Sequence, residues 1–200
     1  MLKAYAWVGG FLSLFSLIAL GIWLWRLPCW RCLVTPNRYH SAPRGFYGGT
    51  SYRPMLKTLA SAQADFRAND RDGNGINDFW RKDVAGLYVV PGTAGAPIKL
   101  IELSTALADS NPQTNISAFG VRGPKTGYWI TAIRHEDEDP RKLDPQRFAY
   151  VAVPVDFPKH DKDIYIIDEN NTVFRKVFDR DVPVTVFPSD LDKNGWKKVD

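Results

Sequence analysis

A run of 22 residues without a charged side chain, from Ala4 to Trp25, constrains this 200-residue chain more than any other feature. As an α-helix the run would be about 33 Å long, slightly more than the hydrocarbon core of a bilayer. Trp7 lies near one end of the run and Trp23 near the other, as interfacial tryptophans do. We therefore expect residues 1–27 to form a single-pass transmembrane anchor.

A cleaved signal peptide is the main alternative for this run. Such a peptide has a shorter apolar core and ends at small residues, and a lipoprotein signal also has small residues before its cysteine. Here the run leads into Arg26, Leu27, Pro28 and Cys29, with no small residue among them. The sequence therefore favours an uncleaved anchor in the cell membrane.

The charge of the chain is unevenly distributed. Residues 1–50 hold 5 of the 26 basic residues and no acid, whereas residues 51–200 hold the other 21 bases and all 22 acids, a net charge of −1. A nucleic-acid-binding domain needs a basic face on its folded part, so we expect no nucleic-acid partner. A basic arm beside an anchor instead favours contact with anionic lipid headgroups of the bilayer.

The segment 28–53 predicts a linker, because it is rich in Pro, Gly and small polar residues. It contains the two cysteines of the chain, Cys29 and Cys32. A structural zinc site usually needs four ligands, and His40 would supply only a third. A disulfide between Cys29 and Cys32, two free thiols or lipidation beside the membrane are the favoured alternatives.

Residues 54–200 predict one α+β domain. Pro54 fits a first helical turn, and apolar residues such as Met55, Leu59 and Phe66 then recur at helical spacing, which predicts a helix that ends near Asn69. Further along, residues 83–90 predict a short helix or the start of a strand, and residues 98–107 predict a short strand or a helical turn.

From residue 128 onward the apolar period changes to two, which predicts strands. Residues 128–133 alternate, residues 148–153 are apolar on both faces, and residues 164–167 and 172–177 flank a polar turn of the hairpin type. We expect the amphipathic helix to pack on a small antiparallel sheet, because both would then bury their apolar surfaces.

Five segments occur in a recognisable order over residues 55–178. They are 56–66 (LKTLASAQADF), 100–108 (LIELSTALA), 125–129 (KTGYW), 148–154 (FAYVAVP) and 165–173 (YIIDENNTV). In these segments and their order the chain resembles the pilin and type II secretion pseudopilin superfamily, and looks most similar to the pilin-like domains of planctomycete-type bacteria.

The resemblance implies a non-enzymatic envelope protein with a structural or interaction role. Its expected partners are related pilin-like subunits or a membrane complex. The chain also departs from the family: Phe15 stands where a prepilin has glutamate, and Pro28 breaks the membrane helix from the rest. The family places the domain outside the cytoplasm, whereas the arginines that follow the anchor favour the opposite topology. We follow the family, because loop charge biases topology without deciding it.

Residues 70–78 (DRDGNGIND) contain the sharpest candidate for a cofactor site, a Ca²⁺ loop. Calcium takes six to eight oxygen ligands, and a glycine such as Gly75 permits the sharp turn such loops need. Position twelve is Arg81 instead of an acid, so Asp83 is a candidate for the missing ligand. A solvated Asn/Gly turn favours the same residue types and is the alternative. The candidate ligands are the oxygens of Asp70, Asp72, Asn74, Ile76 and Asp78.

No catalytic motif is recognisable elsewhere. The sequence shows no nucleophile context and no Gly-rich phosphate loop, so we expect no enzymatic activity. Residues 135–139 (HEDED) resemble a metal-binding cluster but are more typical of a solvated loop between strands.

Overall fold

The computed structural model describes residues 52–92, 95–157, 163–178 and 183–199. These residues belong to one compact unit, Gly45–Asp200. The predicted anchor 1–27, most of the predicted linker 28–53, and the cysteine pair Cys29 and Cys32 lie outside the described residues.

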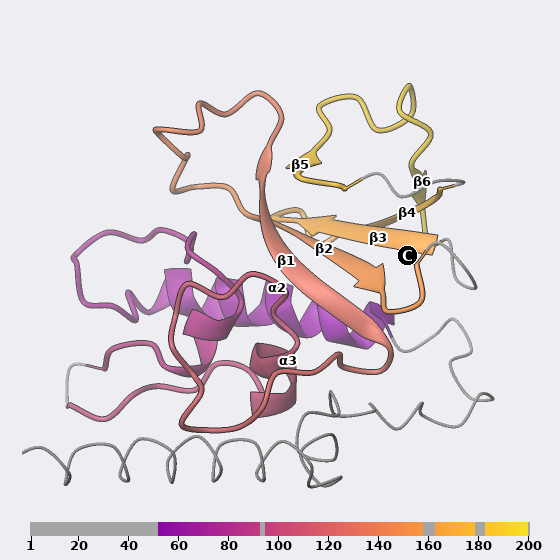
Figure 1. Cartoon of the computed structure of the whole chain (residues 1–200). Coiled ribbons are helices and arrows are strands. Elements are labelled where there is room, and N and C mark those ends of the chain that lie inside the picture. The colour runs from indigo at the N-terminus through magenta and orange to yellow at the C-terminus, as the bar shows by residue number, and fades with distance from the viewer. Residues whose placement is uncertain (1–51, 93–94, 158–162, 179–182, 200) are drawn as a thin grey trace, which may run out of the picture. The chain divides into compact units, whose positions relative to one another are not determined.

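The predicted helix is confirmed as α2, Tyr52–Ala68. It begins two residues before Pro54, so Pro54 lies in the first turn, where a backbone N–H has no partner within the helix. One face of α2 is apolar and buried, and it includes Met55, Leu59 and Phe66. Figure 1 shows α2 running across one face of the sheet.

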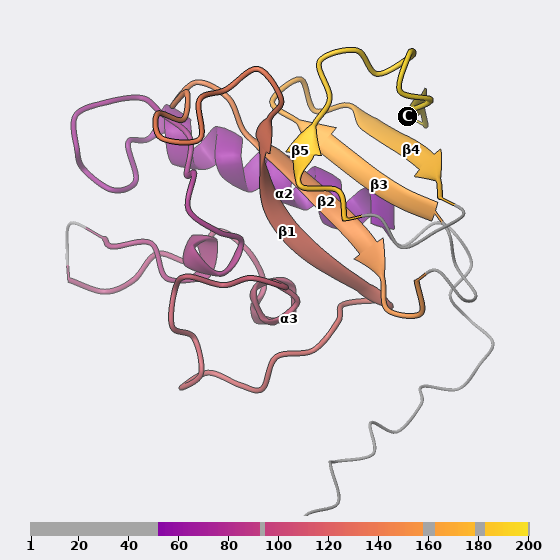
Figure 2. The same ribbon diagram turned by 45° about the horizontal axis from the view of Figure 1, so that its top comes forward.

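The sheet has six strands in the order β5-β1-β2-β3-β4-β6, and Figures 1 and 2 show it from two directions. The four longer strands form an antiparallel series of neighbours in chain order. The strands are β1 (Tyr128–His135), β2 (Ala149–Pro154), β3 (Asp163–Asp168), β4 (Val173–Val177), β5 (Val186–Phe187) and β6 (Lys197–Lys198).

The α+β class is confirmed, but the sheet is mixed instead of wholly antiparallel. β5 pairs with β1 in parallel, with Arg134 opposite Val186 and His135 opposite Phe187. A parallel neighbour is reached by a long connection and not by a tight turn. Here the chain returns from β4, at the other side of the sheet, to the free edge of β1. Strands of two residues have no period, so the sequence pattern did not predict β5 or β6.

The two faces of the sheet bury separate apolar clusters. The face against α2 includes Ile130, Tyr150 and Ile167. The other face includes Val151 and Ile166 and is covered by residues near the C-terminus, among them Phe187 and Trp196. β2 is therefore covered on both faces, as its uninterrupted apolar sequence predicted.

Two short helices lie between α2 and β1: a 3₁₀ helix, η2 (Ala85–Tyr88), and α3 (Leu103–Leu107). The Asp109 carboxylate anchors η2, because its Oδ2 accepts the N–H groups of Val84 at 2.8 Å and Ala85 at 2.9 Å. Burial raises the pKa of Asp109 above its usual value. Gly86 is required here, since a Cβ at this position would lie 2.1 Å from the Trp80 ring.

Gln63 is a polar residue in the buried face of α2, with 0% of its surface exposed. Its Oε1 accepts the Trp80 N–H at 2.9 Å, and its Nε2 donates to the Trp80 carbonyl at 2.8 Å. Nε2 also donates to the Tyr150 hydroxyl of β2. The one amide therefore joins α2, the segment after it and the sheet.

Gln63→Leu should destabilise the domain by about 3 kcal/mol, because it leaves the buried polar groups of Trp80 and Tyr150 without partners. The exposed Gln146, whose Nε2 donates to the Asn77 carbonyl at 3.0 Å, supplies the matched control. Gln146→Leu should change stability by at most about 0.5 kcal/mol. Denaturant unfolding of the full chain, followed by circular dichroism, measures both changes, and equal effects would contradict the role of Gln63.

Candidate functional site

The predicted calcium loop follows α2 directly and is held by its own side chains. Asp70 has a φ of 44°, and its carboxylate accepts the N–H groups of Asn74 at 3.1 Å and Gly75 at 2.9 Å. Asn74 Oδ1 accepts the Ile76 N–H at 2.7 Å. The Asn74–Ile76 bond is that of an Asx turn, the alternative that the sequence also indicated. Asp70 instead accepts from residues four and five positions further on, and so its carboxylate closes the loop as a whole.

The acidic side chains of this loop repel one another. Burial raises the pKa of Asp72, and the nearby charges of Asp78 and Asp70 raise it further. Asp78 Oδ1 is buried, and it has no hydrogen-bond partner among the described residues. The Ile76 carbonyl, another predicted ligand, accepts the Asp78 N–H at 3.0 Å. The loop therefore brings predicted ligands together, but Asp78 Oδ1 has no hydrogen-bond partner among the described residues.

The described part of the chain contains no group of three or more His, Cys, Asp or Glu residues arranged to hold a metal ion. The prediction that Asp83 replaces the missing twelfth ligand is wrong. Asp83 is 2% exposed, and its carboxylate accepts the N–H groups of Gly86 at 2.9 Å and Gln113 at 2.8 Å. Arg81, at position twelve, pairs with Glu138 instead.

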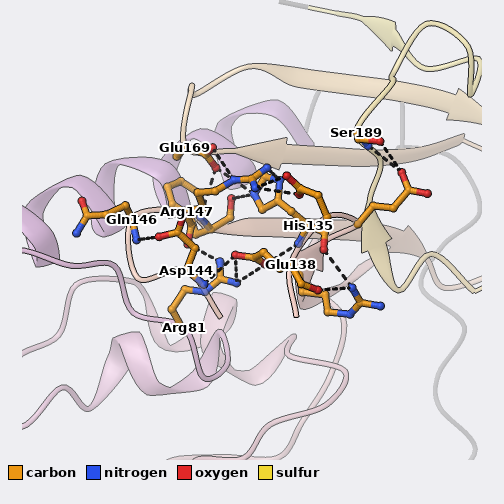
Figure 3. A network of polar contacts seen from close by, with 12 residues as sticks. Arg81, His135, Glu138, Asp144, Gln146, Arg147, Glu169 and Ser189 are labelled. Atoms are coloured by element: carbon orange, nitrogen blue, oxygen red, sulfur yellow. Dashed lines mark hydrogen bonds and ion pairs between the residues drawn. The ribbon is translucent and has the colours of Figure 1, made fainter. Parts of the chain in front are cut away.

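A cluster of ionisable side chains surrounds Glu138, which lies in the connection from β1 to β2 (Figure 3). The Glu138 side chain is 3% exposed, and it accepts hydrogen bonds from Arg81 Nη2 at 2.9 and 3.1 Å. It also accepts the N–H groups of His135 at 2.8 Å and Asp144 at 3.2 Å. Both carboxylate oxygens are thus occupied by donors of the chain itself.

His135 extends the Glu138 cluster to β3. Arg147 Nη2 lies 2.7 Å from His135 Nδ1, and a guanidinium only donates, so Nδ1 accepts and Nε2 carries the proton. Nε2 lies 3.2 Å from the Phe148 carbonyl and 3.1 Å from Glu169 Oε2. The imidazole is therefore held on both nitrogens, as Figure 3 shows.

Glu169 belongs to the turn between β3 and β4. Burial alone would raise its pKa, but the hydrogen bond with His135 and backbone contacts outweigh burial and lower the pKa below its usual value. Arg147 Nε lies 3.6 Å from Glu169 Oε1. The ionised carboxylate therefore ties the turn to the connection from β1 to β2.

The prediction that residues 135–139 form a solvated loop is wrong for two of its residues. His135 is 2% exposed and Glu138 is 8% exposed, although Glu136 and Asp137 are exposed. The signal that could have placed His135 is its spacing of two from the buried Ile133. This spacing puts His135 on the same face of β1 as Ile133, the face opposite α2. No sequence pattern indicated Arg81 as the partner of Glu138, since 57 residues separate the two.

Two of the hollows on the described surface are candidate binding sites. One, of about 600 Å³, runs beside α2 and is bordered by Ala64, Arg67 and Phe148. The other, of about 480 Å³, lies on the sheet face opposite α2 and is lined mainly by apolar side chains, including Trp129 and Val153. The second hollow is the better candidate for a binding site, because its lining is mainly apolar with Arg122 as its charged residue, whereas both Arg67 and Glu169 border the first.

Among the helices in the described ranges, none has the length and apolar character needed to cross a membrane. No protein-family model matches the chain, and neither a curated protein nor a solved structure is found to match it. Function is therefore inferred from the residues and their geometry.

Glu138→Gln should destabilise the domain by about 3 kcal/mol, because it leaves the Arg81 guanidinium, 13% exposed, without its charged partner. The new amide would also place N–H donors against the N–H of His135 or Asp144. Asp137→Asn is the matched control, since its ion pair with Arg147 is exposed and should contribute less. Thermal unfolding of the two variants tests the difference, and a melting temperature of Glu138→Gln equal to that of the parent chain would refute it.

Proposed function

We propose that this chain is a membrane-anchored, non-enzymatic, pilin-like protein of the bacterial cell envelope, with a structural or interaction role. Its domain lies outside the cytoplasm, and the predicted anchor holds it at the bilayer. The observation that carries the proposal is the packing of one long helix, α2, on the antiparallel strands β1–β4. This is the arrangement that the resemblance of residues 55–178 to pilin-like domains implies.

The order of elements supports the same proposal. The charge-free run of 22 residues comes first, a Pro- and Gly-rich segment follows, and α2 then begins at Tyr52. A domain placed after such a segment is tethered to the bilayer and is not the rigid continuation of a membrane helix. We therefore favour a tethered subunit or adaptor over the continuous spine of a filament.

The polar clusters also support a structural role. Gln63 joins α2 to β2, Asp109 anchors η2, and Glu138 joins Arg81 to the connection between β1 and β2. Each of these side chains forms its hydrogen bonds with other residues of the chain. Rigid elements of this kind are suited to presenting a surface to a partner.

The proposed location predicts the outcome of proteolysis in cells. Protease added to spheroplasts, whose inner membrane is intact, should cleave the full chain within residues 52–199, while a cytoplasmic marker protein survives. Cleavage that begins only after the inner membrane is opened would refute an extracytoplasmic domain.

Chemical cross-linking of the same cells should yield adducts with a second copy or with another envelope protein. Recovery of the uncross-linked monomer alone would refute the interaction role.

A calcium-dependent binding module is the second candidate function. It is favoured by the mutual repulsion of Asp70, Asp72 and Asp78, and by the buried Asp78 Oδ1, which has no partner among the described residues. A divalent cation bound between these oxygens would relieve both.

Calorimetric titration of the full chain with Ca²⁺ tests this candidate. Saturable heat is expected for the parent chain and for the control Asp192→Ala, an exposed acid outside the loop, whereas Asp72→Ala should abolish it. Absence of heat in the parent chain would exclude the calcium function and would leave the tethered-adaptor proposal intact.

A further inference from the structure

The hollow of about 480 Å³ is built on the sheet face opposite α2. Its floor follows the strand register, because Trp129 of β1 lies opposite Val153 of β2, and Thr131 lies opposite Val151. Ile164 of β3 extends the floor, and all of these side chains line the hollow. An apolar floor this wide provides room for the body of a small molecule.

The walls come from three other parts of the chain. Phe157 follows β2, and residues 183–185 precede β5, which lies along the outer edge of β1. Ser110 and Arg122 come from the segment between α3 and β1. The walls are therefore apolar on two sides and polar on the third.

Arg122 is the only charged side chain that lines this hollow among the described residues. Its Nε and Nη2 donate to the Asp109 carbonyl at 3.2 and 2.7 Å, and Nη2 also donates to the Ser110 carbonyl at 2.6 Å. Its Cζ lies 5.8 Å from the centre of the Trp129 ring. These contacts hold the guanidinium in place at the edge of the hollow.

The contacts of Arg122 leave part of its binding capacity unused. In the described part of the chain no hydrogen bond uses Nη1, and no carboxylate forms an ion pair with the guanidinium. Nη1 carries two donors in a planar fork that suits a carboxylate. An apolar floor and one positioned, uncompensated cation together match a ligand with an apolar body and a single anionic head.

We propose that this hollow binds a small apolar carboxylate, with the carboxylate on Arg122 and the apolar body over Trp129, Val153 and Ile164. The volume lies within the range of about 300–1,000 Å³ that is typical of small-molecule sites. A cationic ligand is disfavoured by Arg122. A neutral ligand would form no ion pair with Arg122, which is an exposed residue at the edge of the hollow. This inference is independent of the proposed envelope role.

The probe for this site is 4-phenylbutyrate, and the measurement is calorimetric titration of the full chain in lipid nanodiscs. Empty nanodiscs provide the background for partition into lipid. The parent chain should bind the probe saturably with a dissociation constant below about 1 mM. The neutral 4-phenylbutanol and the cationic 4-phenylbutylamine should bind about tenfold more weakly or not at all, because neither supplies an anion for Arg122.

Two pairs of variants separate the site from unspecific effects. Arg122→Gln should weaken binding about tenfold, and Arg122→Lys should restore part of it, whereas Arg141→Gln, the same change on an exposed residue away from the hollow, should have no effect. Val153→Asp should abolish binding, because it places an anion on the floor. Val155→Asp, at a residue 47% exposed that does not line the hollow, should not.

The proposal is overturned if the parent chain shows no saturable binding, or if Arg122→Gln and Val153→Asp bind like the parent while unfolding at its melting temperature. Light scattering adds a separate outcome. If the parent chain binds no probe and Val153→Asp changes the mass of the particle, the hollow is an interface between copies and the small-ligand assignment fails.

Discussion

The rest of the domain depends on the buried amide of Gln63. An amphipathic helix can slide or rotate on a sheet at modest cost while apolar contacts alone hold it, because those contacts have no direction. Gln63 removes that freedom, since its amide pairs with both backbone groups of Trp80 and with the Tyr150 hydroxyl. A buried amide without partners is costly, so α2 has one favourable position on β2.

The Glu138 cluster applies the same principle at another part of the fold. Arg81 follows α2, Glu138 lies between β1 and β2, and Glu169 lies in the turn after β3. Charge-assisted hydrogen bonds connect these three segments through His135 and Arg147. Together the two clusters join α2, the sheet and the connecting loops by buried polar contacts. Its sheet face opposite α2 then keeps a hollow with a defined shape and one positioned cation, Arg122.

Much of the fold was predictable because it depends on local periodicity. The helical spacing from Met55 to Phe66 and the alternation from residue 128 describe elements that bury one face, and the polar turn 168–171 lies between two strands as expected. The short strands β5 and β6 were not predictable, since two residues carry no period and their pairing depends on distant parts of the chain. The buried state of His135 and Glu138 was missed because a run of acids is usually solvated.

The sequence by itself determined the class of the domain, its helix, its longer strands and its acidic loop, because each depends on neighbours within a few residues. Only the tertiary structure decided which polar groups pair across the chain. Arg81 meets Glu138 over 57 residues, and Gln63 meets Tyr150 over 87. It also decided that Asp83 serves η2 instead of the acidic loop, and that Arg122 borders an apolar hollow. The physical reason is that the pairing of polar groups far apart in the sequence is a property of the packed chain and leaves no local pattern in the sequence.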